Sequence, residues 1–387
     1  MAAPKSCVQC GKCLEVCPLF KVTGREELTP RAKFFLESIC SGEGSGEGLS
    51  AKDFKSLASL CLSCGRCEKN CPQHMSGPEL VSDLRAKSKG FTQSCWDLWL
   101  RSPGLLWPMA AALSKFSPEI LPEPFGSARK RMQALFSKSL EPWAELVPQA
   151  KFEERKVILF RGCVGRYARK DWTAKAERLM DGMGLIRAES GEFSCCGSSY
   201  GSAGLLERQS SARAKNIKVW KDADFPLLIT FCATCLKGLK EYSLDDFAGD
   251  EELFAKWQEC LTPLSSLLLD AEVTLFDNAP AQVAYHKPCH ASESDTDQRL
   301  VEIIAGDRLR PVQDGLCCGF GGIMQLGAPE LSKEVGEYSL EQLTKSLELS
   351  GQILSGCSAC VIQLASLVKD EYFAAHWLDI LKLSLIK

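Results

Sequence analysis

Cysteines are the residues of this chain whose type and spacing could do chemistry. Eighteen of the 21 cysteines fall into four groups of two designs, and each design is used twice. The first design, Cys-x2-Cys-x2-Cys-x3-Cys-Pro, comprises Cys7, Cys10, Cys13 and Cys17, and then Cys61, Cys64, Cys67 and Cys71. The second joins a single cysteine, a Cys-Cys-Gly and a Cys-x2-Cys: Cys163, Cys195, Cys196, Cys232 and Cys235, and then Cys289, Cys317, Cys318, Cys357 and Cys360. Thiolates repeated in this way favour soft metals and predict iron–sulfur clusters as cofactors.

The first design is typical of cubane clusters. Three closely spaced thiolates surround one face of a [4Fe-4S] cubane, while the fourth cysteine, ahead of proline, serves the other cluster of a two-cluster protein. By this rule one cubane is bound by Cys7, Cys10, Cys13 and Cys71, and the second by Cys61, Cys64, Cys67 and Cys17. Zinc also takes paired cysteines, but a third and a fourth at fixed offsets exceed what a zinc site needs. The spacing therefore predicts one domain with two cubanes.

Metal chemistry alone does not identify the cluster that the second design would bind. Adjacent cysteines do not easily share one tetrahedral metal, but they can reach different irons of an extended cluster. The glycines that follow each pair would let backbone N–H groups approach sulfur and offset the cost of burying an anionic cluster. They are Gly197, and then Gly319, Gly321 and Gly322. The alternative of ordinary buried cysteines fails, because ten of them would have to recur in register by chance.

The elements that must position these cysteines also repeat. From residue 153 the apolar pattern predicts a strand over 157–160 leading to Cys163, a helix after it, a helix over 205–220, and a strand over 227–231 ending at Cys232. The order recurs with a strand over 283–285, a helix over 300–305 and a strand at 353–354. Equivalent cysteines lie 126, 122 and 125 residues apart, which indicates an internal duplication. We expect the ligands at the carboxyl ends of the strands in two α/β lobes.

We predict an α+β multi-domain protein. An α-helical two-cluster ferredoxin-type domain would occupy 1–90, a helical linker 91–152, a first Cys-Cys-Gly lobe 153–277 and a second 278–387. A helix over 31–40 and a glycine-rich run at 42–48 separate the ferredoxin-type motifs; the run lacks the strand and Lys-Ser/Thr of a nucleotide loop and should be a solvated loop. The linker's four tryptophans and seven prolines predict short, repeatedly broken helices that pack between domains, with a partner or membrane surface as the alternative.

Composition excludes several classes of protein. The formal net charge of −3 offers no basic footprint, so we expect no nucleic-acid partner. The first residues lack the features of a secretory signal, and the longest apolar run, 105–113, has nine residues and contains Pro108, which is too short to span a bilayer. A disulfide framework suits small secreted chains, whereas thiolates that hold iron must stay reduced. We therefore predict a cytoplasmic protein, which a partner could hold at the inner face of the membrane.

Several segments resemble a known family. CVQCGKC at 7–13, YHKPCH at 285–290, CCGFGG at 317–322 and the ending HWLDI at 376–380 are similar to the iron–sulfur subunit of glycolate oxidase. The wider family includes the iron–sulfur subunits of lactate utilisation and of anaerobic glycerol-3-phosphate dehydrogenase, and the D and B subunits of heterodisulfide reductase. In the heterodisulfide reductases each five-cysteine motif holds a noncubane [4Fe-4S] cluster. The resemblance therefore implies one or two noncubane clusters here in addition to the two cubanes, and the intact first motif is similar to the reductase branch.

The expected function is electron transfer. No Gly-x-Gly-x-x-Gly follows a predicted strand and no Ser/His/Asp signature stands out, so we expect no flavin or nicotinamide on this chain and no catalytic residues. A protein with clusters but no hydride cofactor moves electrons between other sites. The resemblance implies an oxidoreductase subunit, not catalytic alone, of a flavin-linked 2-hydroxy acid (glycolate or lactate) dehydrogenase. Its partners would be an FAD-binding subunit and a quinone or membrane electron carrier. The alternatives are disulfide reduction at noncubane clusters, as in heterodisulfide reductase, and a cluster-storage scaffold.

The four histidines and three further cysteines lie outside the cluster motifs. His286 and His290 flank Cys289 and could relay a proton or hydrogen-bond a sulfur, with an ordinary structural role as the alternative. His74 and His376 are expected to pack, the latter in a terminal helix. Three cysteines are predicted to be buried thiols: Cys40, Cys95 and Cys260.

Overall fold

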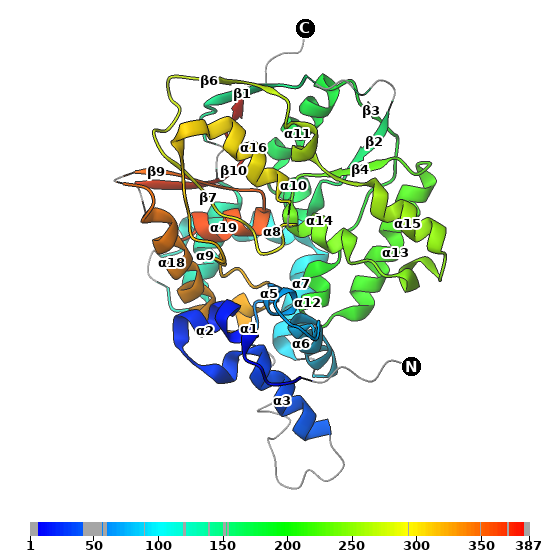
Figure 1. Cartoon of the computed structure of the whole chain (residues 1–387), viewed down its shortest axis with the longest axis vertical. Helices are drawn as coiled ribbons and strands as arrows, with labels where there is room; N and C mark the ends of the chain where they lie inside the picture. The colour runs from blue at the N-terminus through cyan, green and yellow to red at the C-terminus, as the bar shows by residue number, and fades with distance from the viewer. Residues whose placement is uncertain are drawn as a thin grey trace.

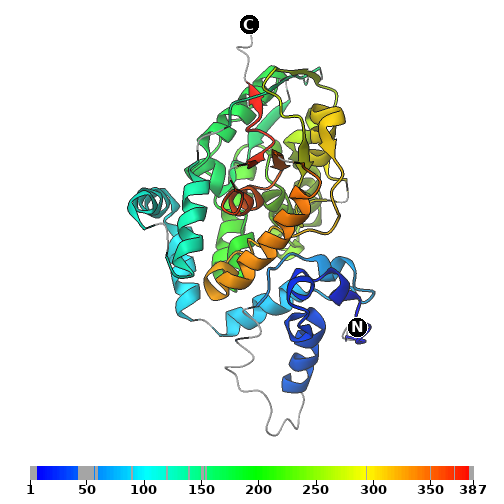
Figure 2. The same ribbon diagram turned by 90° about the vertical axis from the view of Figure 1, so that its left-hand side faces the viewer.

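The computed structural model describes residues 7–41, 56, 60–88, 90–118, 121–137, 140–149, 152, 155–292, 294–348, 350–369 and 371–382, and for 39–41 the backbone alone. The predicted glycine-rich loop at 42–48 and the side chain of Cys40 lie outside these residues. Figure 1 shows the N-terminal helices, in blue, beneath two lobes that carry the green and the yellow-to-red segments. The view turned by 90° shows the same order, so the N-terminal module lies against one end of the paired lobes (Figure 2).

Short helices build the N-terminal module. Its described elements are α1 (Lys12–Val16), α2 (Pro18–Thr23), a 3-10 helix (Glu26–Leu28), α3 (Pro30–Ser41), α5 (Arg66–Lys69) and α6 (Gly77–Lys87). The helix predicted over 31–40 is confirmed as α3. Gly11 and Gly65 precede α1 and α5 in the left-handed conformation, with φ of 82° and 74°. Glycine adopts this conformation without steric cost, so each cysteine loop turns sharply into its helix.

The linker combines three helices and a strand. α7 (Phe91–Arg101), α8 (Pro103–Phe116) and α9 (Phe125–Leu135) precede β1 (Ala144–Val147). The prediction that prolines break these helices is wrong for Pro108, which lies inside α8. Pro108 is exposed while Trp107 is buried, so water can bond to the carbonyl that loses its helical partner. β1 was not predicted, because its strand partners lie far away in sequence.

Two four-stranded parallel sheets form the lobes. The first contains β2 (Lys156–Leu159), β3 (Ile186–Arg187), β4 (Leu227–Thr230) and β5 (Leu261–Pro263) in the order β3-β2-β4-β5. The second contains β7 (Val283–Tyr285), β8 (Leu309–Arg310), β9 (Gly351–Ser355) and β10 (Tyr372–His376) in the order β8-β7-β9-β10. The two sheets therefore share one strand order, as a duplicated segment requires. The strands predicted from the apolar pattern are confirmed as β2, β4, β7 and β9.

Helices cover both sheets (Figure 1). The first lobe has α10 (Gly162–Tyr167), α11 (Lys170–Gly182), α12 (Ser198–Ser202), α13 (Leu206–Asp222), α14 (Ala233–Lys240) and α15 (Glu251–Cys260). The second has α16 (Thr296–Ala305), α17 (Met324–Gly327), α18 (Pro329–Thr344) and α19 (Ser358–Ala365), and short 3-10 helices span Leu244–Phe247, Leu264–Leu267 and Gly306–Arg308. The helices predicted after Cys163, over 205–220 and over 300–305 are confirmed as α11, α13 and α16. The expectation of a terminal helix at His376 is wrong, because His376 pairs with Ser355 as the last residue of β10.

A small mixed sheet joins three distant segments. β11 (Leu381–Lys382), β1 and β6 (Glu272–Leu275) lie in the order β11-β1-β6, so the linker pairs with both the end of the first lobe and the end of the second. One apolar core runs through both lobes and includes the fully buried Trp172, Trp220 and Trp377. Among the described residues, no helix has the length and apolar character needed to cross a membrane.

Candidate metal centres

Each lobe presents cysteines where its parallel strands end. Cys163 follows β2 and Cys232 follows β4, while Cys289 follows β7 and Cys357 follows β9. Cys232 and Cys357 are the N-cap residues of α14 and α19, with φ of −124° and −128° and ψ of 120° and 118°. The carboxyl ends of neighbouring parallel strands meet at one edge of a sheet. The topology therefore gathers these four cysteines at the positions that the sequence predicts.

The ten cysteines of the two lobes form one continuous row of thiols. Side-chain hydrogen-bond contacts run in the order Cys163, Cys195, Cys196, Cys235, Cys232, Cys357, Cys360, Cys318, Cys317 and Cys289. The five cysteines of the second lobe follow in the reverse of the order in which their equivalents occur in the first lobe. A two-fold axis between Cys232 and Cys357 produces this order. Beside this crossing the N–H of Ala233 donates to the carbonyl of Gly356 at 2.9 Å. The structure thus brings each predicted five-cysteine set together and joins the two sets.

Seven of the ten cysteines are buried and the other three are half-buried, so their thiols cannot all ionise without a cation. The hydrogen bond with Cys163 raises the pKa of Cys195 to about 12, and the hydrogen bond with Cys195 raises that of Cys196 to about 12. Hydrogen bonds from Cys235 and Cys357, in contrast, hold the pKa of Cys232 well below its ordinary value. A thiolate is the form that binds metal, and the metal carries the charge that would otherwise repel the neighbouring thiolates. The donor set therefore fits iron–sulfur clusters.

Backbone N–H groups face the paired cysteines. The N–H of Gly197 hydrogen-bonds to the sulfur of Cys195, and the N–H of Gly319 hydrogen-bonds to that of Cys317. Both glycines have positive φ, 97° and 79°, a conformation that side chains rarely adopt. Such donors stabilise sulfur in its charged form, which is the role that the sequence predicted for these glycines.

Two further glycines of the first lobe lie against sulfur and were missed by the sequence reasoning. An added Cβ at Gly162 would lie 2.8 Å from the Sγ of Cys235, and one at Gly238 would lie 2.9 Å from the Sγ of Cys196. The available signal was their proximity in sequence to cluster cysteines, since Gly162 directly precedes Cys163. Their contacts cross between separate segments of the lobe, and only the folded structure shows them.

The eight cysteines of the N-terminal module line two small cavities. The first is lined by Cys7, Cys10, Cys13, Cys71 and also Cys67. The second is lined by Cys17, Cys61, Cys64 and Cys67. The fourth cysteine of each motif thus lies with the first three of the other motif, which is the crossed arrangement that the spacing predicts. Their role as cluster ligands stays a prediction.

Buried cations accompany these cysteine sets. Lys33, Arg85 and Arg131 are 4%, 4% and 3% exposed. Burial lowers the pKa of each, that of Arg131 to about 10. Cys61 opposes this shift for Lys33 and Arg85, and Glu123 and Cys318 oppose it for Arg131. A cation is costly to bury unless a negative group compensates it, so these positions suit sites that hold anionic clusters.

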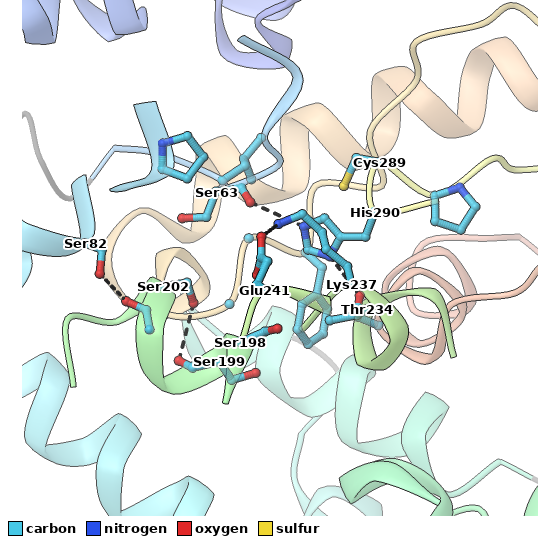
Figure 3. A pocket seen from close by; sticks show the side chains of 18 of the residues that line it. Ser63, Ser82, Ser198, Ser199, Ser202, Thr234, Lys237, Glu241, Cys289 and His290 are labelled. Atoms are coloured by element: carbon cyan, nitrogen blue, oxygen red, sulfur yellow. Dashed lines mark hydrogen bonds and ion pairs between the residues drawn. The ribbon is translucent and has the colours of Figure 1, made fainter. Parts of the chain in front are cut away.

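A cavity of about 510 Å³ lies where the N-terminal module meets both lobes. Its lining includes all five cysteines of the second lobe's set: Cys289, Cys317, Cys318, Cys357 and Cys360. Figure 3 shows His290 between the N-terminal module and α14, where its ring nitrogens reach the carbonyl of Ser63 at 3.3 Å and the hydroxyl of Thr234 at 3.0 Å. Burial raises the pKa of Cys64, and its neighbours Cys317 and Cys289 add to this rise. The second lobe's set is therefore the one that faces the N-terminal cysteines.

The histidines differ in their surroundings. His376 packs as predicted, fully buried, with Nε2 2.9 Å from the carbonyl of Phe231. His74 is exposed, so the expectation that it packs is wrong. His290 has the partners given above. His286 is 1% exposed, and neither of its ring nitrogens has a hydrogen-bond partner among the residues that the structure describes. Burial, aided by the nearby Arg66, lowers the pKa of His286 to about 3, so the ring is neutral.

The three cysteines outside the motifs were predicted to be buried thiols, and the structure confirms this for Cys260 but not for Cys95. Cys260 is buried, as predicted, and its thiol donates to the carbonyl of Trp257 at 3.1 Å. Cys95 is half-buried, and the side chain of Cys40 lies outside the described residues. All the described cysteines are free thiols, so this part of the chain contains no disulfide framework.

Comparison with known families gives matches in all three cysteine-bearing regions. Residues 3–75 match the family described as 4Fe-4S dicluster domain. Residues 157–240 and 283–365 each match the cysteine-rich domain. The second family thus occurs twice, once in each lobe, and its two copies contain the two five-cysteine sets.

Curated relatives match over most of the chain. The glycolate oxidase iron-sulfur subunit of Escherichia coli is 24% identical over 412 residues, covering 99% of this chain and 94% of the relative. The D subunit of dihydromethanophenazine:CoB–CoM heterodisulfide reductase from Methanosarcina mazei is 23% identical, covering 91% of this chain and 86% of the relative. Lactate utilization protein A of Oceanobacillus iheyensis is 23% identical, covering 56% of this chain and 91% of the relative. The resemblance stated from the sequence motifs is confirmed.

Proposed function

We propose that this chain is an iron–sulfur electron-transfer subunit of an oxidoreductase, because it belongs with the proteins that join a 4Fe-4S dicluster domain to two cysteine-rich domains. Its enzyme is a flavin-linked 2-hydroxy acid dehydrogenase, in keeping with relatives named for glycolate oxidase and lactate utilisation. The chain passes electrons from the FAD of a partner subunit to a quinone or another carrier. It is not catalytic alone.

One observation carries this proposal, namely the continuity of the cysteine sets. Cys67 lines the cavities of both N-terminal sets. Cys64 of the second set neighbours Cys317 and Cys289 of the second lobe. The second lobe's set in turn contacts the first lobe's set through Cys357 and Cys232. Clusters held by these residues supply one-electron transfer. A protein built only to store clusters has no need for sets that adjoin in one line.

The proposal assigns ligands to four sites. Cys7, Cys10, Cys13 and Cys71 hold one cubane, and Cys17, Cys61, Cys64 and Cys67 hold the other. Each five-cysteine set holds a noncubane [4Fe-4S] cluster. Because these ligands need a reducing environment, the protein works in the cytoplasm, with its FAD-binding partner and, through a carrier subunit, at the inner face of the membrane.

Anaerobic purification of the full chain with its partner tests the proposal. We expect nearly sixteen irons per chain on the basis of four four-iron clusters, a co-purifying flavoprotein, and bleaching of the clusters when D-lactate or glycolate is added. Eight irons would contradict the noncubane sites in both lobes. Colourless or zinc-loaded protein would contradict the electron-transfer role itself.

The second candidate function is reduction of a disulfide, because the Methanosarcina relative is named a heterodisulfide reductase. The observation that favours it is the 510 Å³ cavity, which all five cysteines of the second set line. Oxidation of the dithionite-reduced chain by an organic disulfide, monitored by cluster absorbance, tests this candidate. Rapid reoxidation by the disulfide but not by a quinone would favour it, and the reverse result would favour the dehydrogenase role.

A further inference from the structure

The two lobes differ at one buried position beside their cysteine sets. Phe160 in the first lobe and His286 in the second each precede the first cysteine of their set by three residues. Their backbones are equivalent, because the N–H of Phe160 donates to the carbonyl of Ile229 at 2.7 Å and that of His286 donates to Leu354 at 2.8 Å. Phe160 packs edge-on against Phe193 with 5.4 Å between the ring centroids. The second lobe thus carries an imidazole where the first carries an apolar ring.

The imidazole of His286 lacks the partners that the other buried histidines have. The ring nitrogens of His290 reach Thr234 and Ser63, and both nitrogens of His376 reach backbone groups. Neither nitrogen of His286 meets a partner within the described part of the chain, although the residue is 1% exposed. Burying a polar ring without a partner is unfavourable. The ring therefore requires a partner that the described side chains do not supply.

Two cysteine sulfurs lie close to this ring. One ring nitrogen of His286 and the Sγ atoms of Cys318 and Cys360 lie within 4.8 Å of one another, and all three residues are buried. Within the described residues this is the one trio of histidine, cysteine or carboxylate ligands that meets that distance. Neutral imidazole and thiolate both bind iron, and clusters with histidine ligands beside cysteine ligands exist.

We propose that His286 is a nitrogen ligand of iron in the second lobe, together with Cys318 and Cys360, whereas the first lobe's site has sulfur ligands alone. The inference rests on the proposed function, because it requires a cluster at the second five-cysteine set. It makes the two lobes chemically unequal although their cysteines match one for one. Cys318 and Cys360 also line the cavity that faces the N-terminal module, whereas His286 lines a separate cavity of about 420 Å³.

Pulsed electron paramagnetic resonance on the anaerobic, full-length chain labelled with ¹⁵N-histidine tests the proposal directly. The protein is poised at the potential where the second-lobe cluster is paramagnetic. We expect a ¹⁵N hyperfine coupling as large as that of the coordinated histidines of a Rieske protein measured in the same way. An absent coupling, or one as weak as that of a histidine that only hydrogen-bonds to sulfur, would overturn the assignment. This measurement needs no substitution and does not depend on how a variant folds.

Substitutions then identify the residue. His286→Phe gives the second lobe the ring of the first, and we expect it to abolish the ¹⁵N coupling and change the second-lobe Mössbauer spectrum while the N-terminal cluster signals persist. His290→Gln and the exposed His74→Gln are the matched controls and should keep the coupling. Loss of the coupling in His290→Gln but not in His286→Phe would overturn the assignment to His286.

Failure of the proposed function has a different signature. If the unaltered chain holds iron at the N-terminal sets alone, the second-lobe cluster and the His286 assignment both fall. If the second-lobe cluster is present but shows no nitrogen coupling, the assignment alone falls and the electron-transfer role stands.

Discussion

At the residue scale, the sites are defined as much by small and cationic residues as by cysteine. Gly162 and Gly238 leave sulfur atoms room that any side chain would fill. Lys33, Arg85 and Arg131 are buried cations near cysteine sets, and they would offset negative charge that the fold must hold away from water. These glycines and cations affect the cysteine sites without supplying a ligand. Substitutions at these positions can therefore separate an effect on metal binding from an effect on folding.

Gly162→Ala should remove the metal that we propose for the first lobe. The new Cβ would lie 2.8 Å from the Sγ of Cys235, so the thiol must move. Gly184→Ala is the control, because Gly184 has a similar φ of 75° but open space around its Cβ position. Both variants carry a left-handed backbone cost of roughly 1–2 kcal/mol. We expect iron analysis to show loss in Gly162→Ala alone, and equal iron in both variants would contradict the contact with Cys235.

Lys33→Met should lower the midpoint potential of the cubane that we propose beside Cys17 and Cys61. Lys33 is buried next to both thiols, and removal of its charge makes an added electron less favourable there. A tenfold change in the one-electron equilibrium corresponds to a fall on the order of 60 mV. A redox titration followed by electron paramagnetic resonance measures this fall in potential. Lys87→Met is the matched control, because it removes the same charge at an exposed position. Equal shifts in the two variants would show that the position of the charge does not matter.

At the element scale, the sequence predicted the helices and strands whose pattern of apolar residues is visible within one short segment. β2, β4, β7 and β9 are short apolar runs that each end at a cysteine, and α11, α13 and α16 keep helical spacing, so pattern alone located them. β1, β6 and β11 were missed, because pairing in the β11-β1-β6 sheet joins residues more than one hundred positions apart. The same limit applies to the row of ten thiols. Spacing grouped the cysteines into sets, but the order of contact and the crossing at Cys232 and Cys357 depend on how the lobes pack.

The helix α8 has one buried face and one exposed face, and substitutions on the two faces should differ in their effect on stability. Trp107 is 5% exposed, donates to the carbonyl of Trp99 at 3.2 Å, and lies 6.3 Å from the ring of Tyr167, whereas Leu113 on the other face is 68% exposed. Trp107→Ala should therefore lower the free energy of unfolding by about 3–5 kcal/mol. Leu113→Ala should change it by less than about 0.5 kcal/mol. Urea unfolding followed by circular dichroism measures both, and similar effects would contradict the packing of α8 through Trp107.

At the scale of the whole molecule, the N-terminal module and the second lobe share a core. Cys17, Leu19, Leu28 and Leu62 pack with Cys317, Met324, Ala328 and Val335. Polar contacts extend this interface to both lobes, since Lys69 donates to the carbonyl of Ala291 at 3.3 Å and Ser82 donates to that of Gly201 at 2.7 Å. The sequence predicted a ferredoxin-type region from its motifs, yet nothing in the motifs indicates that its apolar face is completed by residues three hundred positions away.

This shared core predicts that a substitution at Leu62 has different effects in the full chain and in a fragment of residues 1–90. Leu62 is 7% exposed in the full chain and contacts the second lobe at Gly321, so Leu62→Ala should cost about 2–5 kcal/mol there. In the fragment the covering residues are gone, and the same change should cost less than about 1 kcal/mol because Leu62 already faces water. Urea titration of the cluster absorbance of all four proteins measures the difference. Equal costs in the two contexts would mean that the module completes its own core, and that the cubane sites we propose there do not depend on contact with the second lobe.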